Sequence, residues 1–263
     1  MYEDYRALRF ERRGRVLTVT MSRPQTKNAV DDRMHTELAQ LFADLARDPD
    51  CDVIVLTGEG DAFSAGGDIG AMQEKIADRR RWITTIEEAR RIFYGMLDLE
   101  KPLIARVNGA AVGLGATLAV YADIAVAAES AVIGDPHTRV GLVAGDGGAL
   151  LWPFVVGFQR AKELLFTGEI LPAREAARLG LIAHCVPDAE LDAKVEALAE
   201  RLARGPRHAI GWTKRAMHHS LRMLAHGTME ASLLAETLSQ LTDDHAEALD
   251  AFQSRRKPRF SGN

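Results

Sequence analysis

Continuous runs of apolar and β-branched residues recur through the first half of the chain. They cover residues 16–21, 53–58 and 103–107, and a shorter run follows at 124–127. Runs of this kind, bounded by glycine or proline, are typical of strands buried on both faces of a sheet. The pattern therefore predicts at least four strands within the first half of the chain.

Helical spacing separates these strands. Between the first two, apolar residues recur at i, i+4 and i+7 over 34–45, with Asp31 or Asp32 as a candidate N-cap and Asp48-Pro49-Asp50 as the stop. A charged helix is expected over 72–91, with a solvated face. Strands alternating with helices predict an α/β fold with a parallel sheet.

The pattern changes near Pro172, beyond which the chain reads as almost wholly helical. Helices are expected over 173–179, over 191–202 and from 206 to about 241. The predicted organisation is thus an α/β core followed by a helical C-terminal region.

Composition narrows the functional classes. The 263 residues include 33 Lys+Arg against 37 Asp+Glu, a net charge of −4, which argues against a nucleic-acid footprint. The two cysteines cannot form a disulfide framework or a thiolate metal site. The uncharged stretch 109–122 falls short of the about 20 residues that span a bilayer, and the acidic N-terminus does not read as a signal peptide. A cytoplasmic protein with no membrane partner is expected.

Two glycine-rich turns lie between strand and helix patterns, at 63–69 (FSAGGDI) and 108–116 (NGAAVGLGA). Glycines let the backbone approach a ligand, and helix starts offer unpaired N–H groups. Two such turns can aim two N–H donors at one oxygen, as in an oxyanion hole. Tight packing of the backbone is the alternative explanation, and the second turn matches a dinucleotide fingerprint only weakly because its third glycine is missing.

A third glycine-rich segment, 133–148, contains His137 and Asp146. His137 is a candidate acid or base near neutral pH, or else a structural or surface histidine. Asp146 is a candidate carboxylate of the site, or else the cap of a helix that begins near Ala149.

The order of these three motifs resembles that of the enoyl-CoA hydratase/isomerase (crotonase) superfamily. The resemblance runs over roughly residues 8–260 and includes further segments near both ends of the chain: SRP with NAV at 22–30, FTG at 166–168, AARLGLI at 176–182, and AF with RRKP at 251–258.

The resemblance implies a spiral of ββα units over residues 1–185, which binds an acyl-CoA thioester, and a helical trimerisation region over 186–263. It implies no metal and no cofactor other than the coenzyme A of the substrate, and a homotrimer or homohexamer. By position, the oxyanion-hole donors are the backbone N–H groups of Gly67 and Leu114.

The same resemblance places coenzyme A along the first turn. The residues concerned are Ala65, Gly66, Asp68 and Ile69, with Lys27 and the basic tail at 255–257 as candidate phosphate partners. Asp68 is also expected to hold that turn through hydrogen bonds to its backbone.

The sequence departs from the superfamily at the acid–base positions. Thr117 and His137 stand where well-known hydratases carry two glutamates. Thr117 cannot titrate in the useful range, whereas His137 can. Asp146 is hypothesised to pair with His137 and to supply a carboxylate.

Three functions therefore remain open. The leading one is hydration or isomerisation of an enoyl-CoA with non-standard acid and base residues. The alternatives are a CoA-thioester decarboxylase or hydrolase that uses His137, and a non-catalytic member that binds a CoA-thioester or RNA.

Overall fold

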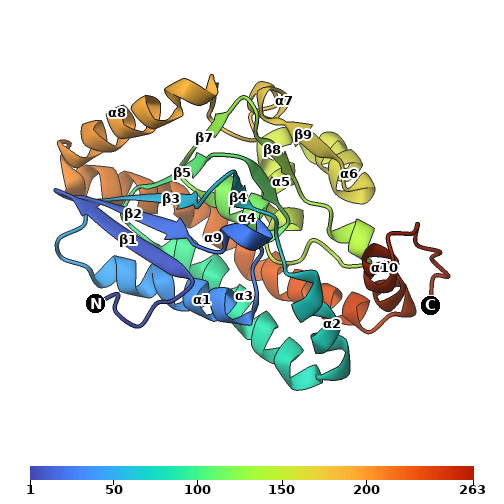
Figure 1. Cartoon of the computed structure of the whole chain (residues 1–263). Helices are drawn as coiled ribbons and strands as arrows, with labels where there is room; N and C mark the ends of the chain where they lie inside the picture. The colour runs from blue at the N-terminus through green and yellow to red at the C-terminus, as the bar shows by residue number, and fades with distance from the viewer.

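The computed structural model describes residues 1–263 as strands and helices in the order shown in Figure 1. The strands are β1 (Leu8–Arg13), β2 (Val16–Met21), β3 (Val53–Gly58), β4 (Ala62–Ser64), β5 (Leu103–Val107), β6 (Ala110–Val112), β7 (Ile124–Ala128), β8 (Val132–Gly134), β9 (Ile170–Pro172) and β10 (His184–Val186). The helices are α1 (Asp32–Arg47), α2 (Ile69–Ala77), α3 (Arg79–Asp98), α4 (Leu114–Tyr121), α5 (Gly148–Val156), α6 (Phe158–Thr167), α7 (Ala173–Arg178), α8 (Leu191–Ala203), α9 (Arg207–Gln240) and α10 (Asp243–Gln253). Short 3₁₀ helices are η1 (Pro24–Thr26), η2 (His137–Val140) and η3 (Asp188–Glu190).

Two sheets organise the core. The larger has the order β1-β2-β3-β5-β7-β10, and the smaller has the order β4-β6-β8-β9. From β2 to β10 the neighbouring strands of the larger sheet are parallel. Successive pairs β3–β4, β5–β6 and β7–β8 each place one strand in each sheet before a helix follows. This repeated ββα unit confirms the predicted α/β spiral.

Helices cover the larger sheet on both sides. Helix α8 packs on β3, β5 and β7, whereas α1 and α3 pack side by side below the strands in Figure 1. The apolar side of α1 supplies Leu38, Phe42 and Leu45, all nearly inaccessible to solvent. Asp31 caps this helix by accepting a hydrogen bond from the N–H of Met34, as the sequence predicted for Asp31 or Asp32.

The structure divides the helix expected over 72–91 into two. Helix α2 ends at Asp78, whose side chain then accepts the N–H of Arg80 and caps α3. Asp78 favours the N-cap position over a position inside a helix, so the chain starts a new helix there and does not continue the first one. Strand β1 was not predicted from the sequence, because its residues LRFERR are mostly polar and are exposed at the edge of the sheet.

The C-terminal region returns to the core at two places. Strand β10 pairs with β7, and α10 packs against both α2 and η2. In Figure 1, α10 lies beside the C-terminus, close to the end of α2. No helix combines the length and the apolar content needed to cross a bilayer.

Candidate active site

The two glycine-rich turns are in direct contact. A Cβ placed on Gly66, whose φ is +87°, would lie 2.7 Å from the carbonyl oxygen of Val112. A Cβ placed on Gly113, whose φ is +54°, would lie 3.7 Å from the Cα of Gly66. Gly66 therefore combines a positive φ with a close approach that a side chain would block, whereas Gly113 requires glycine for its positive φ alone. This contact brings Gly67 and Leu114 to one place.

Hydrogen bonds around Gly67 determine which way its N–H points. Val30 donates its N–H to the carbonyl of Gly66 and accepts the N–H of Asp68, at 2.7 and 3.0 Å. Val30 and Gly67 thus form a parallel β-bridge, in which the hydrogen bonds to Val30 are made by Gly66 and Asp68, the residues on either side of Gly67. The N–H of Gly67 consequently points away from Val30.

Leu114 opens helix α4, so its N–H precedes the first repeating bond of the helix. The neighbouring N–H of Gly113 donates to the carbonyl of Gly134 at 2.9 Å. Asp68 fixes the other turn, because its carboxylate accepts the N–H groups of Gly70 and Ala71 at the start of α2. Both turns are thus held by backbone bonds, and Asp68 holds its turn as the sequence predicted.

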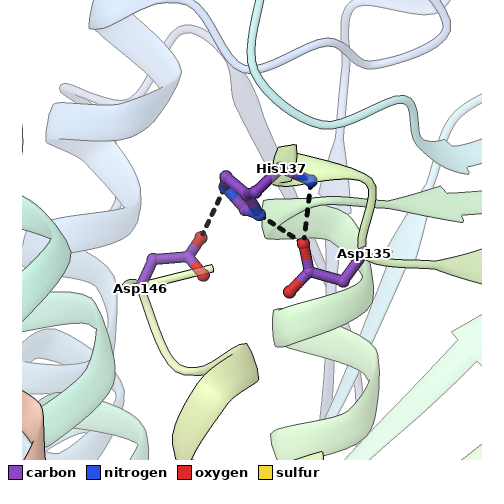
Figure 2. Close-up of side chains that lie close together, drawn as sticks. All are labelled: Asp135, His137 and Asp146. Carbon is purple, nitrogen blue, oxygen red and sulfur yellow. Dashed lines mark hydrogen bonds and ion pairs between the residues drawn. The ribbon is translucent and has the colours of Figure 1, made fainter. Parts of the chain in front are cut away.

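His137 lies between two carboxylates (Figure 2). Its Nδ1 bonds to Asp135, whose same oxygen accepts the backbone N–H of His137 at 3.4 Å. Its Nε2 lies 3.9 Å from Oδ2 of Asp146. His137 is buried, not a surface histidine, and its Cε1 lies 3.9 Å from a Cβ placed on Gly113. The imidazole therefore stands directly beside the second turn.

Asp146 faces His137 and does not cap α5. The N-cap position of α5 is Gly147, which provides no side-chain bond. Instead, Oδ1 of Asp146 accepts the hydroxyl of Thr117 at 3.1 Å. Thr117 thus holds the carboxylate by a hydrogen bond and carries no titrating group of its own. The structure thus brings together Thr117, His137 and Asp146, the three side chains that the sequence predicted for this part of the site.

Burial and neighbouring charges shift the pKa values of His137 and Asp146. Burial alone would lower the pKa of His137, but the charges of Asp135 and Asp146 and the Asp135 hydrogen bond raise it well above its usual value. Burial raises the pKa of Asp146, which His137 and Thr117 oppose. The two carboxylates therefore favour the imidazolium form of His137, which donates a proton rather than accepting one.

The ligand atoms of Asp135, His137 and Asp146 lie within 4.8 Å of one another, a set that a cation can use in principle. A ligating imidazole must be neutral, however, and the Nδ1 of His137 already bonds to Asp135. The raised pKa of His137 runs against that requirement. We therefore interpret the three residues as a proton-transfer cluster.

A cavity of about 660 Å³ opens in front of His137. Its lining includes four of the residues predicted to bind coenzyme A, namely Ala65, Gly66, Asp68 and Ile69, together with Gly67. The opposite wall comes from α10 and the segment after it, through Ala248, Phe252, Arg256 and Pro258. A helix that the sequence did not predict individually thus completes the cavity.

The basic groups around the cavity differ from the expected set. Arg256 lines the cavity but forms ion pairs with Glu247 and Asp250. Lys27 is exposed and does not line the cavity, although Thr26 and Ala29 on either side of it do. Arg139 lies within the third glycine-rich segment but was not predicted as a binding residue. It lines the cavity and donates through Nε to the carbonyl of Thr167 at 3.2 Å.

Comparison with known proteins agrees with this geometry. The family model for enoyl-CoA hydratase/isomerase matches residues 11–263. A probable enoyl-CoA hydratase of Rhodobacter capsulatus is 37% identical over 98% of this chain and 99% of its own, and the 1,2-epoxyphenylacetyl-CoA isomerase of Escherichia coli is 32% identical over 94% and 95%. The crystal structure of an enoyl-CoA hydratase/isomerase from Mycobacterium paratuberculosis superposes with a TM-score of 0.90 at 38% identity, covering 93% of this chain and 97% of the other. Through its sequence, its two-sheet spiral and its paired turns, this chain belongs to the enoyl-CoA hydratase/isomerase family, as an enzyme of the lyase or isomerase type.

Proposed function

We propose that the enzyme hydrates or isomerises an enoyl-CoA through an enolate held by the N–H groups of Gly67 and Leu114. The observation that carries this proposal is the position of His137, between Asp135 and Asp146 and beside the second turn. A preorganised donor of this kind contributes about 3 kcal/mol to stabilising the developing charge. Two donors and one acid–base pair are sufficient for either reaction.

The protonation states suggest how the proton-transfer groups divide their work. In hydration, Asp146 accepts a proton from water as the water oxygen bonds to C3, and the C2=C3 electrons move into the thioester enolate. The imidazolium of His137 then gives its Nε2 proton to C2, and the proton on Asp146 restores the pair. In isomerisation of a 3-enoyl-CoA, Asp146 removes a proton from C2 to form a dienolate. Asp146 then returns that proton to C4, so that the C3=C4 double bond becomes C2=C3.

Coenzyme A is proposed to enter along Ala65–Ile69, with Arg139 beside its phosphates. Arg139 is favoured over Arg256 because Arg256 is engaged by Glu247 and Asp250. Lys27 stays a second candidate, since it is exposed next to the lining residue Thr26. No metal and no further cofactor takes part in this proposal.

Incubation with crotonyl-CoA is the direct test. We expect the absorbance of the conjugated thioester to fall at a turnover on the order of 10 per second, with the 3-hydroxy thioester as product. A 3-enoyl-CoA that gains this absorbance would identify the isomerase. Release of free thiol or of CO2 from 3-oxo or malonyl-type thioesters, with no change in crotonyl-CoA, would contradict the proposal and favour a hydrolase or decarboxylase.

The same substrate tests the docking of coenzyme A. An Arg139→Ala variant should raise KM about tenfold with kcat nearly unchanged, because a phosphate contact away from the reacting carbons is made equally in ground and transition states. Arg160→Ala, at an exposed arginine of α6, is the control. An unchanged KM would remove Arg139 from the binding site.

We propose further that the helices of residues 186–263 assemble the chain into a homotrimer or homohexamer. Large apolar side chains are exposed on α9, including Trp212, Met217, Met223, Leu234 and Leu238, and Phe154, Phe158 and Phe166 are exposed on α5 and α6. Such clusters on a folded chain mark protein interfaces. Sedimentation equilibrium should give the mass of three or six chains, and the mass of a single chain at micromolar concentration would contradict the proposal.

A further inference from the structure

A third carboxyl group, that of Glu236, lies beside the residue that precedes Asp146 in the chain. Glu236, on α9, is 6% exposed, and its Oε2 has no hydrogen-bond partner. That oxygen lies 2.6 Å from a Cβ placed on Gly145, the residue before Asp146. Nothing in the local sequence indicated this position, because α9 lies about ninety residues further along the chain.

Helix α9 is fixed against the segment that carries Asp146. Ser239 Oγ accepts the N–H of Val143 at 3.0 Å, and the carbonyl of Ser232 lies 2.5 Å from the Cβ position of Gly145. This close packing leaves room for no side chain at residue 145. Glu236 therefore keeps a set position relative to Asp146.

We infer that Glu236 is a positioning residue for proton transfer, which as a neutral carboxylic acid keeps Asp146 and His137 in their working protonation states. This inference rests on the proposed function. Its physical basis is that two adjacent buried carboxyls do not both ionise at neutral pH. Of the two, Asp146 is the one stabilised by the imidazolium and by the hydroxyl of Thr117.

The charged groups that act on Glu236 lie on two segments of the chain. Asp146, Asp135 and His137 lie on the glycine-rich segment, and Lys75 lies on α2. Lys75 is itself engaged, because its Nζ lies 2.9 Å from Oδ1 of Asp32. Across the site, His35 of α1 acts on Asp146. Burial, and then the charge of Asp146, raise the pKa of Glu236 to about 8.

Ionisation of Glu236 would make His137 a weaker proton donor. A new negative charge there would raise the pKa of His137 further, so that the imidazolium would release its proton to carbon less readily. The neutral form of Glu236 thus corresponds to the active state. The reaction should lose rate as the pH rises through the ionisation of Glu236.

The test compares Glu236→Gln with the wild type across pH. For the wild type we expect kcat/KM to fall about fivefold between pH 8 and pH 9, as the neutral fraction of a group with a pKa of about 8 does. In Glu236→Gln, which keeps the shape but cannot ionise, the fall over the same range should be less than about twofold. Glu230→Gln, at an exposed glutamate on the same helix, should follow the wild type.

A second measurement needs no turnover. NMR titration of labelled histidine, with the His137 signal assigned from a His137→Gln variant, should show a lower midpoint for His137 in Glu236→Gln than in wild type. An identical midpoint and an unchanged pH profile would overturn the inference. If no enoyl-CoA reacts, the proposed function fails, yet the shift of the His137 midpoint still decides the inference about Glu236.

Discussion

Replacing His137 by alanine is expected to lower kcat/KM by about 10²- to 10⁴-fold, the usual contribution of a general acid or base. His137 is the titratable group beside the turn that carries Leu114, and its Nε2 faces Asp146 at 3.9 Å. His137→Gln should lose nearly as much, because glutamine can hydrogen-bond but cannot release a proton. Steady-state kinetics on the substrate that reacts with the wild type provide the measurement.

His219→Ala is the control for this variant, since His219 is an exposed histidine on α9. The pairing of His137 with Asp146 is tested by the double variant. If the two residues act as a unit, the loss in the double variant should be close to that of His137→Ala alone. Additive losses would contradict the pairing, and full activity of His137→Ala would remove His137 from the mechanism.

Gly66→Ala should lower kcat about 10²-fold, comparable to removing one donor of an oxyanion hole. The new Cβ would lie 2.7 Å from the carbonyl oxygen of Val112, so the two turns must separate. Their separation would move the N–H of Gly67 away from the thioester oxygen that, on the proposed mechanism, Leu114 also holds. Single-turnover rates measure this effect apart from substrate binding.

Gly60→Ala is a matched control. Gly60 has a φ of +80°, close to the +87° of Gly66, but its Cβ would meet only Pro24, at 3.4 Å. Both variants therefore carry a backbone strain of about 1–2 kcal/mol, visible in thermal unfolding. If Gly66→Ala kept kcat within about threefold of Gly60→Ala, the contact between the turns would have no catalytic role.

The parts of the fold that were predicted depend on local patterns. Helix α1 and strands β2, β3, β5 and β7 carry their apolar spacing within one segment, and each was predicted within one or two residues. Strands β9 and β10 have three residues each, too few to show a period. The sequence did not predict β9, and it placed β10 in a helical region. Their pairing with distant strands, not their own propensity, makes them strands.

The residues of the candidate site also fall into two groups, those found from local sequence motifs and those that only the structure shows. The glycine-rich turns and His137 could be found because each motif lies within a few residues. Glu236 could not, because its relevance comes from packing between segments far apart in the chain. Arg139 lies in the same segment as His137, but only the structure shows that it lines the cavity. Asp146 had two local interpretations, as a cap or as a partner of His137, and only the three-dimensional arrangement distinguishes them.

The contact between Gly66 and Val112 has a consequence for how such a site can be redesigned. In the proposed mechanism the donors to the enolate are main-chain groups of two turns in close contact. The proposed proton-transfer groups are the side chains of His137 and Asp146, with Thr117 and Glu236 beside Asp146. Substitutions at these four positions leave the main-chain groups in place. On this proposal the scaffold separates the stabilisation of an enolate from the choice of where its protons go, and a new reaction can be sought by exchanging side chains alone.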